Sequence, residues 1–377
     1  MHIISGVRTP IGAFQGSLKD LKAPELGGIA LKSARGDIDP SAIDEVIMGC
    51  VLSAGLGQAP ARQACLKSGQ PDSTPAFTLN KVCGSGMKAI MLGADRIALG
   101  ESHLVLAGGM ESMTNAPYLL EKARSGYRFG HGEILDHMAL DGLEDAYSNR
   151  TSMGVFAQVM AEEEGFSRQA QDEFVLSSLE RSRTSVQVLA KEMIGVGELL
   201  QDELPTKGRP EKIPLLKPAF KKDGTITAAS SGALSDGAAA VLLGSDEALS
   251  KYNLKSLAKI VGQSQFSGKP EDYTKAPVGS IHKLLEKLKW DIKDVDLFEV
   301  NEAFAVVPMY AMKLLSIPHA KINIHGGACS LGHPIGMSGA RVIITLAHAL
   351  EHYNLKRGIA SVCIGGGEAL AVALERH

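Results

Sequence analysis

Two short apolar patterns each occur twice in this chain, about 250 residues apart and in the same order. Asp44-Glu-Val-Ile-Met-Gly is similar to Asp296-Leu-Phe-Glu-Val-Asn, and Leu104-Val-Leu-Ala-Gly-Gly-Met-Glu is similar to Ser361-Val-Cys-Ile-Gly-Gly-Gly-Glu. A duplicated half-fold produces such a pattern, because each copy needs the same buried strands in the same order. Chance similarity between buried strands is the alternative at this point.

Short apolar runs alternate with helical patterns and glycine-rich turns, which is typical of α/β architecture. Strands are expected at 45–51, 104–107, 238–243, 297–300 and 360–364. Helices are expected after Cys83 (to about Leu99), after Asn301 and after Gly336.

The segment 117–224 differs from the rest in composition, because it contains most of the polar helical sequence. It includes an amphipathic run at 168–193 and a stretch at 204–214 rich in Pro, Gly and charge, which we expect to be a loop. We therefore predict an inserted domain that covers the active site. The predicted boundaries are 1–116 plus 225–248 for the N-terminal half, 117–224 for the insertion and 249–377 for the C-terminal half.

Charge and cysteine content exclude several classes of protein. The formal net charge is −3, so nothing favours nucleic acid as a partner. The N-terminus lacks a secretory signal pattern, and the apolar stretch 342–350 is too short to span a bilayer. Five widely spaced cysteines do not form a disulfide framework. We expect a cytoplasmic protein with no membrane partner.

Cys83 is the first candidate for chemistry. It lies in Asn80-Lys-Val-Cys-Gly-Ser-Gly, between an apolar strand and a helix. At a helix N-terminus the free N–H groups and the helix dipole favour a thiolate, so we expect the pKa of this thiol to be lowered. The alternative is a buried cysteine in a tight turn.

Three further motifs place polar groups at the ends of strands or beside helices. His333 stands between Gly332 and Pro334 in a glycine-rich turn, which would hold its ring rigidly. Cys363 enters the glycine run that begins at Gly365, where backbone N–H groups can point at an oxyanion. Asn301 follows a strand directly, and a helix N-cap is its simplest interpretation.

A metal site is an alternative for part of this set. His325, Cys329 and His333 are spaced four residues apart, which would align them on a helix. The glycines and the proline around them make a helix there unfavourable. We therefore predict no metal.

Taken together, the motifs resemble the thiolase family in order and spacing. They are Asn80-Lys-Val-Cys-Gly-Ser-Gly-Met-Lys-Ala, Gly108-Gly-Met-Glu-Ser-Met-Thr-Asn-Ala-Pro-Tyr, Asn301-Glu-Ala-Phe-Ala, Gly326-Gly-Ala with Gly332-His-Pro-Ile-Gly, and Cys363-Ile-Gly-Gly-Gly. The likeness runs from Ser5-Gly-Val-Arg-Thr-Pro-Ile-Gly to the C-terminus. It implies a duplicated αβαβα layered core with an inserted loop domain, and a homodimer or homotetramer.

The resemblance also implies a role for each candidate residue. Cys83 matches the nucleophile that carries the acyl group, and His333 matches its base. Cys363 matches the second thiol, which moves a proton on and off the α-carbon. Asn301, through a held water, and His333 would stabilise the enolate, and the N–H groups of Cys83 and Gly365 would hold the tetrahedral oxyanion.

The resemblance to the thiolase family predicts fewer of the contacts with coenzyme A than of the catalytic residues. The loop Thr227-Ala-Ala-Ser-Ser-Gly-Ala-Leu-Ser-Asp-Gly resembles the CoA-contacting loop of the family, but the contacting serine falls on Gly232, beside Ser231. His325 and Glu368 also depart from the family pattern, and the segment 204–218 is shortened. Ser231, Phe304 and Met153 are the candidate substrate contacts.

The implied activity is reversible condensation of two acetyl-CoA to acetoacetyl-CoA and CoA, with no cofactor besides CoA as substrate and product. Met153 beside the acyl pocket favours short chains. A degradative 3-ketoacyl-CoA thiolase for longer chains is the first alternative. A non-catalytic acyl-CoA or lipid-binding protein is the second, and the presence of Cys83, His333, Cys363 and Asn301 argues against it. A decarboxylating ketoacyl synthase is a third, and its single cysteine does not match.

Overall fold

The computed structural model describes residues 1–376 and is organised around one path of hydrogen-bonded strands. The order along the path is β10-β11-β12-β9-β1-β8-β5-β3-β4, with β2 attached to β8. The strands are β1 (His2–Arg8), β2 (Gly12–Ala13), β3 (Glu45–Gly49), β4 (Ala76–Leu79), β5 (Leu104–Ser112), β8 (Ser235–Gly244), β9 (Ala258–Ser267), β10 (Leu297–Val300), β11 (Arg357–Ile364) and β12 (Glu368–Glu375).

The two halves of this path repeat one pattern. In the N-terminal half β3 is parallel to β5, β5 is antiparallel to β8, and β8 is antiparallel to β1. In the C-terminal half β10, β11, β12 and β9 follow each other with the same directions. The halves join where His2 and Ile3 pair with Lys259 and Ala258. The predicted duplication is confirmed, because the repeated patterns form β3 and β10, and β5 and β11.

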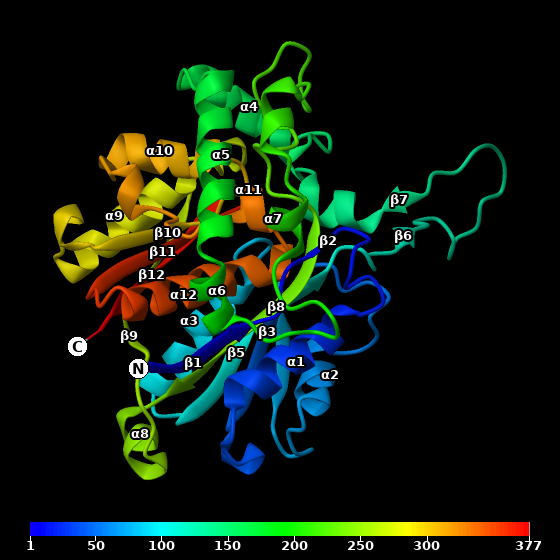
Figure 1. The fold of residues 1–377 in the computed structure, drawn as a ribbon. Coiled ribbons are helices and arrows are strands. Elements are labelled where there is room, and N and C mark those ends of the chain that lie inside the picture. Colours follow the sequence, from blue (N-terminus) through cyan, green and yellow to red (C-terminus); the bar gives the residue numbers. More distant parts are fainter. Residues whose placement is uncertain (377) are drawn as a thin grey trace.

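Two helices lie between the halves. They are α3 (Ser85–Ala98) and α12 (Ile335–His352), which pack on each other and on strands of both halves (Figure 1). Outside the N-terminal half lie α1 (Ala23–Arg35) and α2 (Pro60–Lys67). Outside the other half lie α9 (Ala276–Leu288) and α10 (Val306–Leu315). The predicted αβαβα layering is therefore confirmed.

Glycines allow the two central helices to touch backbone to backbone. A Cβ at Gly86 would lie 2.9 Å from the carbonyl oxygen of Gly336, and one at Gly339 would lie 2.6 Å from the amide nitrogen of Met87. Almost every residue of α12 is buried, as expected for a helix that is apolar on all sides. The N-termini of α3 and α12 therefore lie side by side, and this contact positions the residues that precede them.

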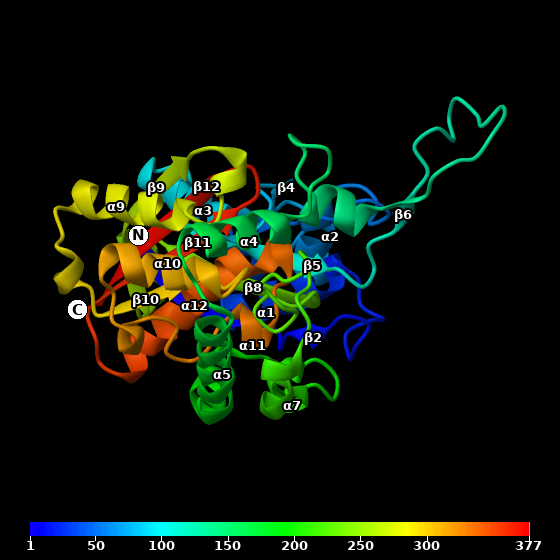
Figure 2. The same ribbon diagram turned by 90° about the horizontal axis from the view of Figure 1, so that it is seen from above.

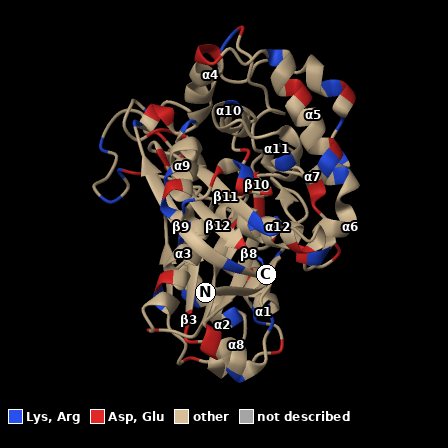
Figure 3. Cartoon of the chain, turned by 90° about the vertical axis from the view of Figure 1, so that its left-hand side faces the viewer, with Lys and Arg blue, Asp and Glu red and all other residues tan. Residues whose placement is uncertain are grey.

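The inserted segment covers the C-terminal half with α4 (Met153–Glu163) and α5 (Arg168–Thr184). A long arm leaves the body and returns through the short strands β6 (Tyr118–Leu119) and β7 (Leu135–Asp136) (Figures 1 and 2). Residues of both charges are interspersed on the outer helices α5 and α9 (Figure 3). The domain boundaries given above stay a prediction, and their last residue, His377, lies outside the described residues.

The run 168–193 is helical as predicted, with a break at Ser185 that divides it into α5, α6 (Val186–Leu189) and a 3-10 turn, η3 (Ala190–Glu192). One local prediction in this segment is wrong. The stretch 204–214 is not a plain loop, since it contains α7 (Glu203–Lys207) and the 3-10 helix η4 (Pro210–Leu215). Pro205 and Pro210 stand in the first turns of these short helices, where a missing N–H costs nothing.

The remaining elements are short. They are α8 (Asp246–Tyr252), α11 (Ala328–Leu331), η1 (Pro40–Ala42), the π-helical η2 (Ala139–Leu143), η5 (Pro270–Asp272), η6 (Ile292–Asp294) and η7 (His319–Lys321). Within residues 1–376, no helix has the length and apolar character needed to cross a membrane.

Candidate active site

Cys83 stands in the turn between β4 and α3, as predicted from the sequence. The turn is held by Ser85, whose Oγ accepts from the Lys81 N–H (2.8 Å) and donates to the Val82 carbonyl (2.7 Å). Val82 has a φ of +45°, which is a strained conformation for a β-branched residue. Ser85 and the Asn80 side chain, which accepts from the Val82 N–H, keep this conformation in place and so fix the direction of Cys83.

The backbone N–H groups of Gly365 and of Cys83 itself lie near the Cys83 sulfur and lower the pKa of its thiol. Burial nevertheless raises the pKa of the Cys83 thiol to about 11, and the two N–H groups only partly offset this effect. The expectation of a lowered pKa is therefore wrong, because desolvation outweighs the helix N-terminus. The thiol is protonated at neutral pH and needs a base for attack.

Cys363 ends β11 close to Cys83. Its side chain is fully buried, and burial together with the neighbouring Cys83 raises the pKa of the Cys363 thiol well above its usual range. The loop that follows consists of Gly365, Gly366 and Gly367, and the last two have φ values of +88° and +83°. Two thiols from opposite halves of the chain thus lie near one another beside a glycine loop.

Tyr273 borders the same two thiols, and the sequence analysis missed it. Burial raises its pKa well above the usual range, with smaller contributions from Cys363 and Cys83. Its hydroxyl donates to the carbonyl of Met153 (2.9 Å). The Met153 Cε would lie 3.6 Å from a Cβ on Gly365, so this predicted pocket residue does face the glycine loop. Tyr273 belongs to none of the recognised motifs, so the sequence held no signal for it.

His333 precedes α12 and lies beside the origin of α3. Gly86 and Gly336 are in contact. Cys83 stands three residues before Gly86, and His333 stands three residues before Gly336. The His333 N–H donates to the Ala233 carbonyl (2.8 Å), and its Nδ1 lies 2.6 Å from the Ser338 Oγ. Because Ser338 donates to the Pro334 carbonyl, its oxygen accepts from Nδ1–H, which assigns the tautomer. The basic nitrogen is then Nε2, which has no partner within residues 1–376.

The His333 ring is neutral over the physiological range. Burial, helped by the charge of Arg341, lowers the pKa of His333 to about 4. Asn301 is buried beside it, with its Nδ2 at 3.4 Å from Nδ1 of His333. Asn301 is not an N-cap, because α10 begins only at Val306. The structure thus places Asn301 with His333 and away from its simplest sequence interpretation.

Two charged residues without a predicted role support this arrangement. Arg341 donates to the Asn301 Oδ1 (3.3 Å) and to Glu299 (3.1 Å), so the Asn301 amide turns its nitrogen toward His333. Glu111 accepts from the N–H groups of Val51, Leu52 and Gly336 at 3.0–3.1 Å. Burial raises the pKa of Glu111 to about 7 against these bonds. Glu111 stood inside a recognised motif and Arg341 did not, and a burial pattern alone does not identify such partners.

The predicted CoA loop lies against the His333 turn. A Cβ at Gly232 would be 3.0 Å from both the His333 Cβ and the Glu302 carbonyl, so a side chain there would displace one of them. Ser231 forms a β-bridge with Phe304, and its hydroxyl donates to the Thr227 carbonyl (2.8 Å). The ring of Phe304 meets that of Phe220 edge-on, with centroids 5.8 Å apart. Phe220 was not among the predicted contacts.

A groove of about 330 Å³ runs from this loop to the shortened segment. Ala229, Ala233 and Cys329 line its inner end, and Arg209 and Lys212 line it where α7 and η4 meet. Neither cation has an ion-pair partner among residues 1–376. The groove therefore combines an apolar wall with unpaired positive charge.

The metal alternative fails on backbone geometry. Gly326 and Gly332 have φ values of +80° and +109°, so only the four residues of α11 are helical and His325, Cys329 and His333 share no face. Within the described part of the chain no three metal-binding side chains converge. His325 is instead buried and stacked on Tyr353.

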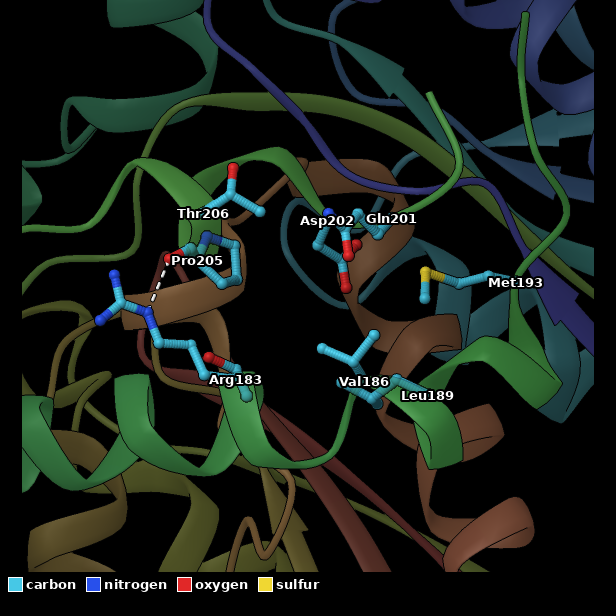
Figure 4. A pocket seen from close by; sticks show the side chains of 9 residues that line it. Arg183, Val186, Leu189, Met193, Gln201, Asp202, Pro205 and Thr206 are labelled. Carbon is cyan, nitrogen blue, oxygen red and sulfur yellow. Dashed lines mark hydrogen bonds between the residues drawn. The ribbon is translucent and has the colours of Figure 1, made fainter. Parts of the chain in front are cut away.

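A small cavity of about 100 Å³ lies between α5, α6 and α7 (Figure 4). Its wall includes Val186, Leu189 and Asp202, and none of the predicted site residues lines it. Arg8 already binds the carboxylate of Asp202 from the other side, at 2.6 and 2.9 Å. This cavity is therefore separate from the cysteine pair.

Comparison with known proteins gives matches along the whole chain. Residues 1–247 match the family model of the thiolase N-terminal domain and residues 254–376 that of the thiolase C-terminal domain. A probable acetyl-CoA acetyltransferase of Dictyostelium discoideum is 44% identical, over 99% of this chain and 93% of the relative. An acetyl-CoA acetyltransferase of Schizosaccharomyces pombe is 43% identical, over 100% and 98%. A thiolase from Ascaris suum, crystallised with coenzyme A, superimposes with a TM-score of 0.95 at 39% identity, covering 100% and 99% of the two chains.

Proposed function

The chain belongs to the thiolase family, and on that premise we propose that it is an acetyl-CoA C-acetyltransferase. It joins two acetyl-CoA into acetoacetyl-CoA and CoA, and it catalyses the reverse cleavage. The observation that supports this most is the pair of neighbouring thiols, Cys83 and Cys363, with the Gly365 N–H near the Cys83 sulfur.

In the first half-reaction the acetyl group moves from CoA to Cys83. His333 Nε2 accepts the thiol proton while the sulfur attacks the thioester carbonyl. The N–H groups of Cys83 and Gly365 hold the oxyanion of the tetrahedral intermediate, which is worth roughly 2.7–4 kcal/mol per donor in comparable sites. The intermediate then expels the CoA thiolate, which takes the proton from His333.

In the second half-reaction a new carbon–carbon bond forms. Cys363 gives its proton to the Nε2 of His333, and the resulting thiolate removes an α-proton from the second acetyl-CoA. Asn301 (through a held water) and the Nε2–H of His333 stabilise the enolate oxygen. The enolate carbon attacks the acetyl group on Cys83, and acetoacetyl-CoA leaves as the Cys83 sulfur takes the proton from His333. Two cysteines are needed because an acylated sulfur cannot also act as a base.

Short acyl chains are the proposed substrates. Met153, between Tyr273 and the glycine loop, restricts the space beside Gly365. The groove with Arg209 and Lys212 is proposed to hold the pantetheine arm and phosphates of CoA, and Ser231 and Phe304 would border the arm. Coenzyme A is the only cofactor-like molecule required, as substrate and product.

The proposal includes a cytoplasmic location and assembly into a homodimer or homotetramer. Support for a reducing compartment comes from five cysteines that are all free. Support for assembly comes from β4, the last strand of the sheet path, and from the exposed apolar residues of the arm, such as Phe129.

CoA-dependent cleavage of acetoacetyl-CoA and of 3-ketohexadecanoyl-CoA, measured side by side, tests this function. We expect kcat/KM to be higher for acetoacetyl-CoA by at least about tenfold, since each misfitting methylene is worth roughly 1–3 kcal/mol. Equal or faster cleavage of the long substrate would instead assign the chain to degradation of longer 3-ketoacyl chains. Absence of cleavage with both would contradict an acyltransferase.

A further inference from the structure

One ion pair connects the Cys83 turn directly to the glycine loop of the other half. The Nζ of Lys81, two residues before Cys83, donates to the carboxylate of Glu368. Glu368 begins β12, immediately after Gly365, Gly366 and Gly367. The side chains are 26% and 32% exposed, so the pair is partly shielded from water. Glu368 was noted above as a departure from the family pattern.

Both partners are themselves held in place. The Lys81 N–H donates to the Ser85 Oγ (2.8 Å), and the Lys81 carbonyl accepts from the Gly84 N–H (3.0 Å). Glu368 pairs with Ile364 across the β11–β12 hairpin and thereby closes the three-glycine loop. Its carboxylate also accepts from the Ser267 Oγ (3.1 Å). The ion pair therefore connects the Cys83 turn and the β11–β12 hairpin, which are each held by other hydrogen bonds.

The start of the glycine loop has few restraints of its own. Gly367 is held, because its carbonyl accepts from the Gly268 N–H (2.8 Å) and its Cα lies against the Lys269 backbone, whereas a Cβ on Gly365 would meet nothing nearer than 3.6 Å. Yet the Gly365 N–H lies near enough to the Cys83 sulfur to lower the pKa of that thiol. A loop of this kind needs an external contact to hold its N–H in one position, and Lys81–Glu368 lies at its closing residue.

We propose that Lys81 and Glu368 are a positioning pair that sets the separation between the Cys83 and Gly365 N–H groups. This inference rests on the proposed function, in which those two groups hold the oxyanion of acyl transfer. Neither side chain touches the sulfur, so the pair acts through the backbone it aligns. Losing it should slow the acylation step and leave substrate binding nearly unchanged, because the oxyanion exists only along the reaction path.

Three variants test the pair: Glu368→Gln, Lys81→Met and the charge-exchanged Lys81→Glu/Glu368→Lys. We expect each single variant to lower kcat for acetoacetyl-CoA cleavage and the rate of Cys83 acetylation by roughly tenfold, with KM within about twofold. The exchanged pair should regain most of the loss. The single variants change the local charge in opposite directions. A loss of rate in both therefore indicates positioning of the backbone rather than a change in the electrostatic field at Cys83.

Glu375→Gln is the matched control. It removes the Arg357–Glu375 pair (3.0 Å) at the other end of the same β11–β12 hairpin, where the side chains are 30% and 18% exposed. Both rates should remain at the wild-type level in this variant. Unchanged kcat and acetylation in Glu368→Gln and Lys81→Met, or a fall in melting temperature alone, would overturn the proposal. A wild-type chain that never acetylates Cys83 would overturn the function itself.

Discussion

At the scale of single residues, Cys83 and His333 rest as a neutral pair. Burial raises the pKa of Cys83 to about 11 and lowers that of His333 to about 4, so neither is charged at pH 7. A preformed thiolate–imidazolium pair would require a lowered pKa for Cys83 and a raised pKa for His333. In the proposed mechanism the proton therefore moves to His333 during attack, while the two N–H groups stabilise the charge that develops on the acyl oxygen.

His333→Ala should slow alkylation of Cys83 by iodoacetamide near neutral pH and lower turnover by about 10²–10⁴-fold, because the base is lost. In the wild type the alkylation rate should rise steadily from pH 5 to 8 without a step near 6.5, since His333 stays neutral there. His282→Ala, which changes a histidine with a 63% exposed side chain on α9, is the control. Unchanged alkylation in His333→Ala would rule out the base role.

Cys363→Ala should separate the two half-reactions. The variant should still accept an acetyl group on Cys83, because the Gly365 N–H and His333 remain in place. It should no longer exchange the α-protons of acetyl-CoA in heavy water, because the second thiol is missing. Mass spectrometry follows the acetyl group and NMR follows the exchange. Wild-type exchange in the variant would refute the role of Cys363.

The sequence predicted the candidate reactive residues and missed the residues that hold them. Cys83, His333 and Cys363 each lie beside glycine or proline residues in a recognisable pattern. Tyr273 and Arg341 act through contacts between distant segments, which no local pattern encodes. The lowered pKa expected for Cys83 failed for a similar reason, since the depth of burial is a property of the assembled fold.

At the scale of elements, the site depends on backbone contact between α12 and its neighbours. A Cβ at Gly109 in β5 would overlap the carbonyl oxygen of Gly336 at the start of α12. Gly336 stands three residues after His333, so any displacement there reaches the base. The duplicated strands and both central helices were predictable from apolar patterns, whereas the crossing of α3 and α12 on glycines was not.

Gly109→Ala should therefore destabilise the chain by about 3 kcal/mol, because the added methyl group has no room against backbone atoms. Urea unfolding would measure this as a lower midpoint. Gly268→Ala is a suitable comparison, since its nearest neighbour is the ring of Phe266 at 3.3 Å, which can turn aside. Equal midpoints for the two variants would show that the α12 contact is not tight.

At the scale of the whole molecule, the two halves contribute one thiol each and meet over the central helices. The sheet path ends at β10 and at β4, and β4 leads into the Cys83 turn and contains Phe77, which is 40% exposed. An unpaired edge strand is a ready surface for a second copy of the chain. The duplication was readable from the sequence, while the edge strand became visible only once the strand order was known.

Phe77→Lys should shift the protein toward monomer, because it places a charge on this edge. Light scattering after size exclusion would show the loss of mass. Leu99→Lys, at the end of α3 and 75% exposed, changes an apolar side chain away from the edge and should leave the mass unchanged. A monomeric wild type, or an oligomer that persists in Phe77→Lys, would contradict assembly through β4.

The proposed mechanism depends on an acyl-thioester at Cys83. Incubation with acetyl-CoA, followed by digestion and tandem mass spectrometry, locates the acetyl group directly. We predict one acetyl group on the peptide that contains Cys83, which disappears when free CoA is added. An acetyl group found only on Cys363 or Cys50, or none at all, would contradict the mechanism.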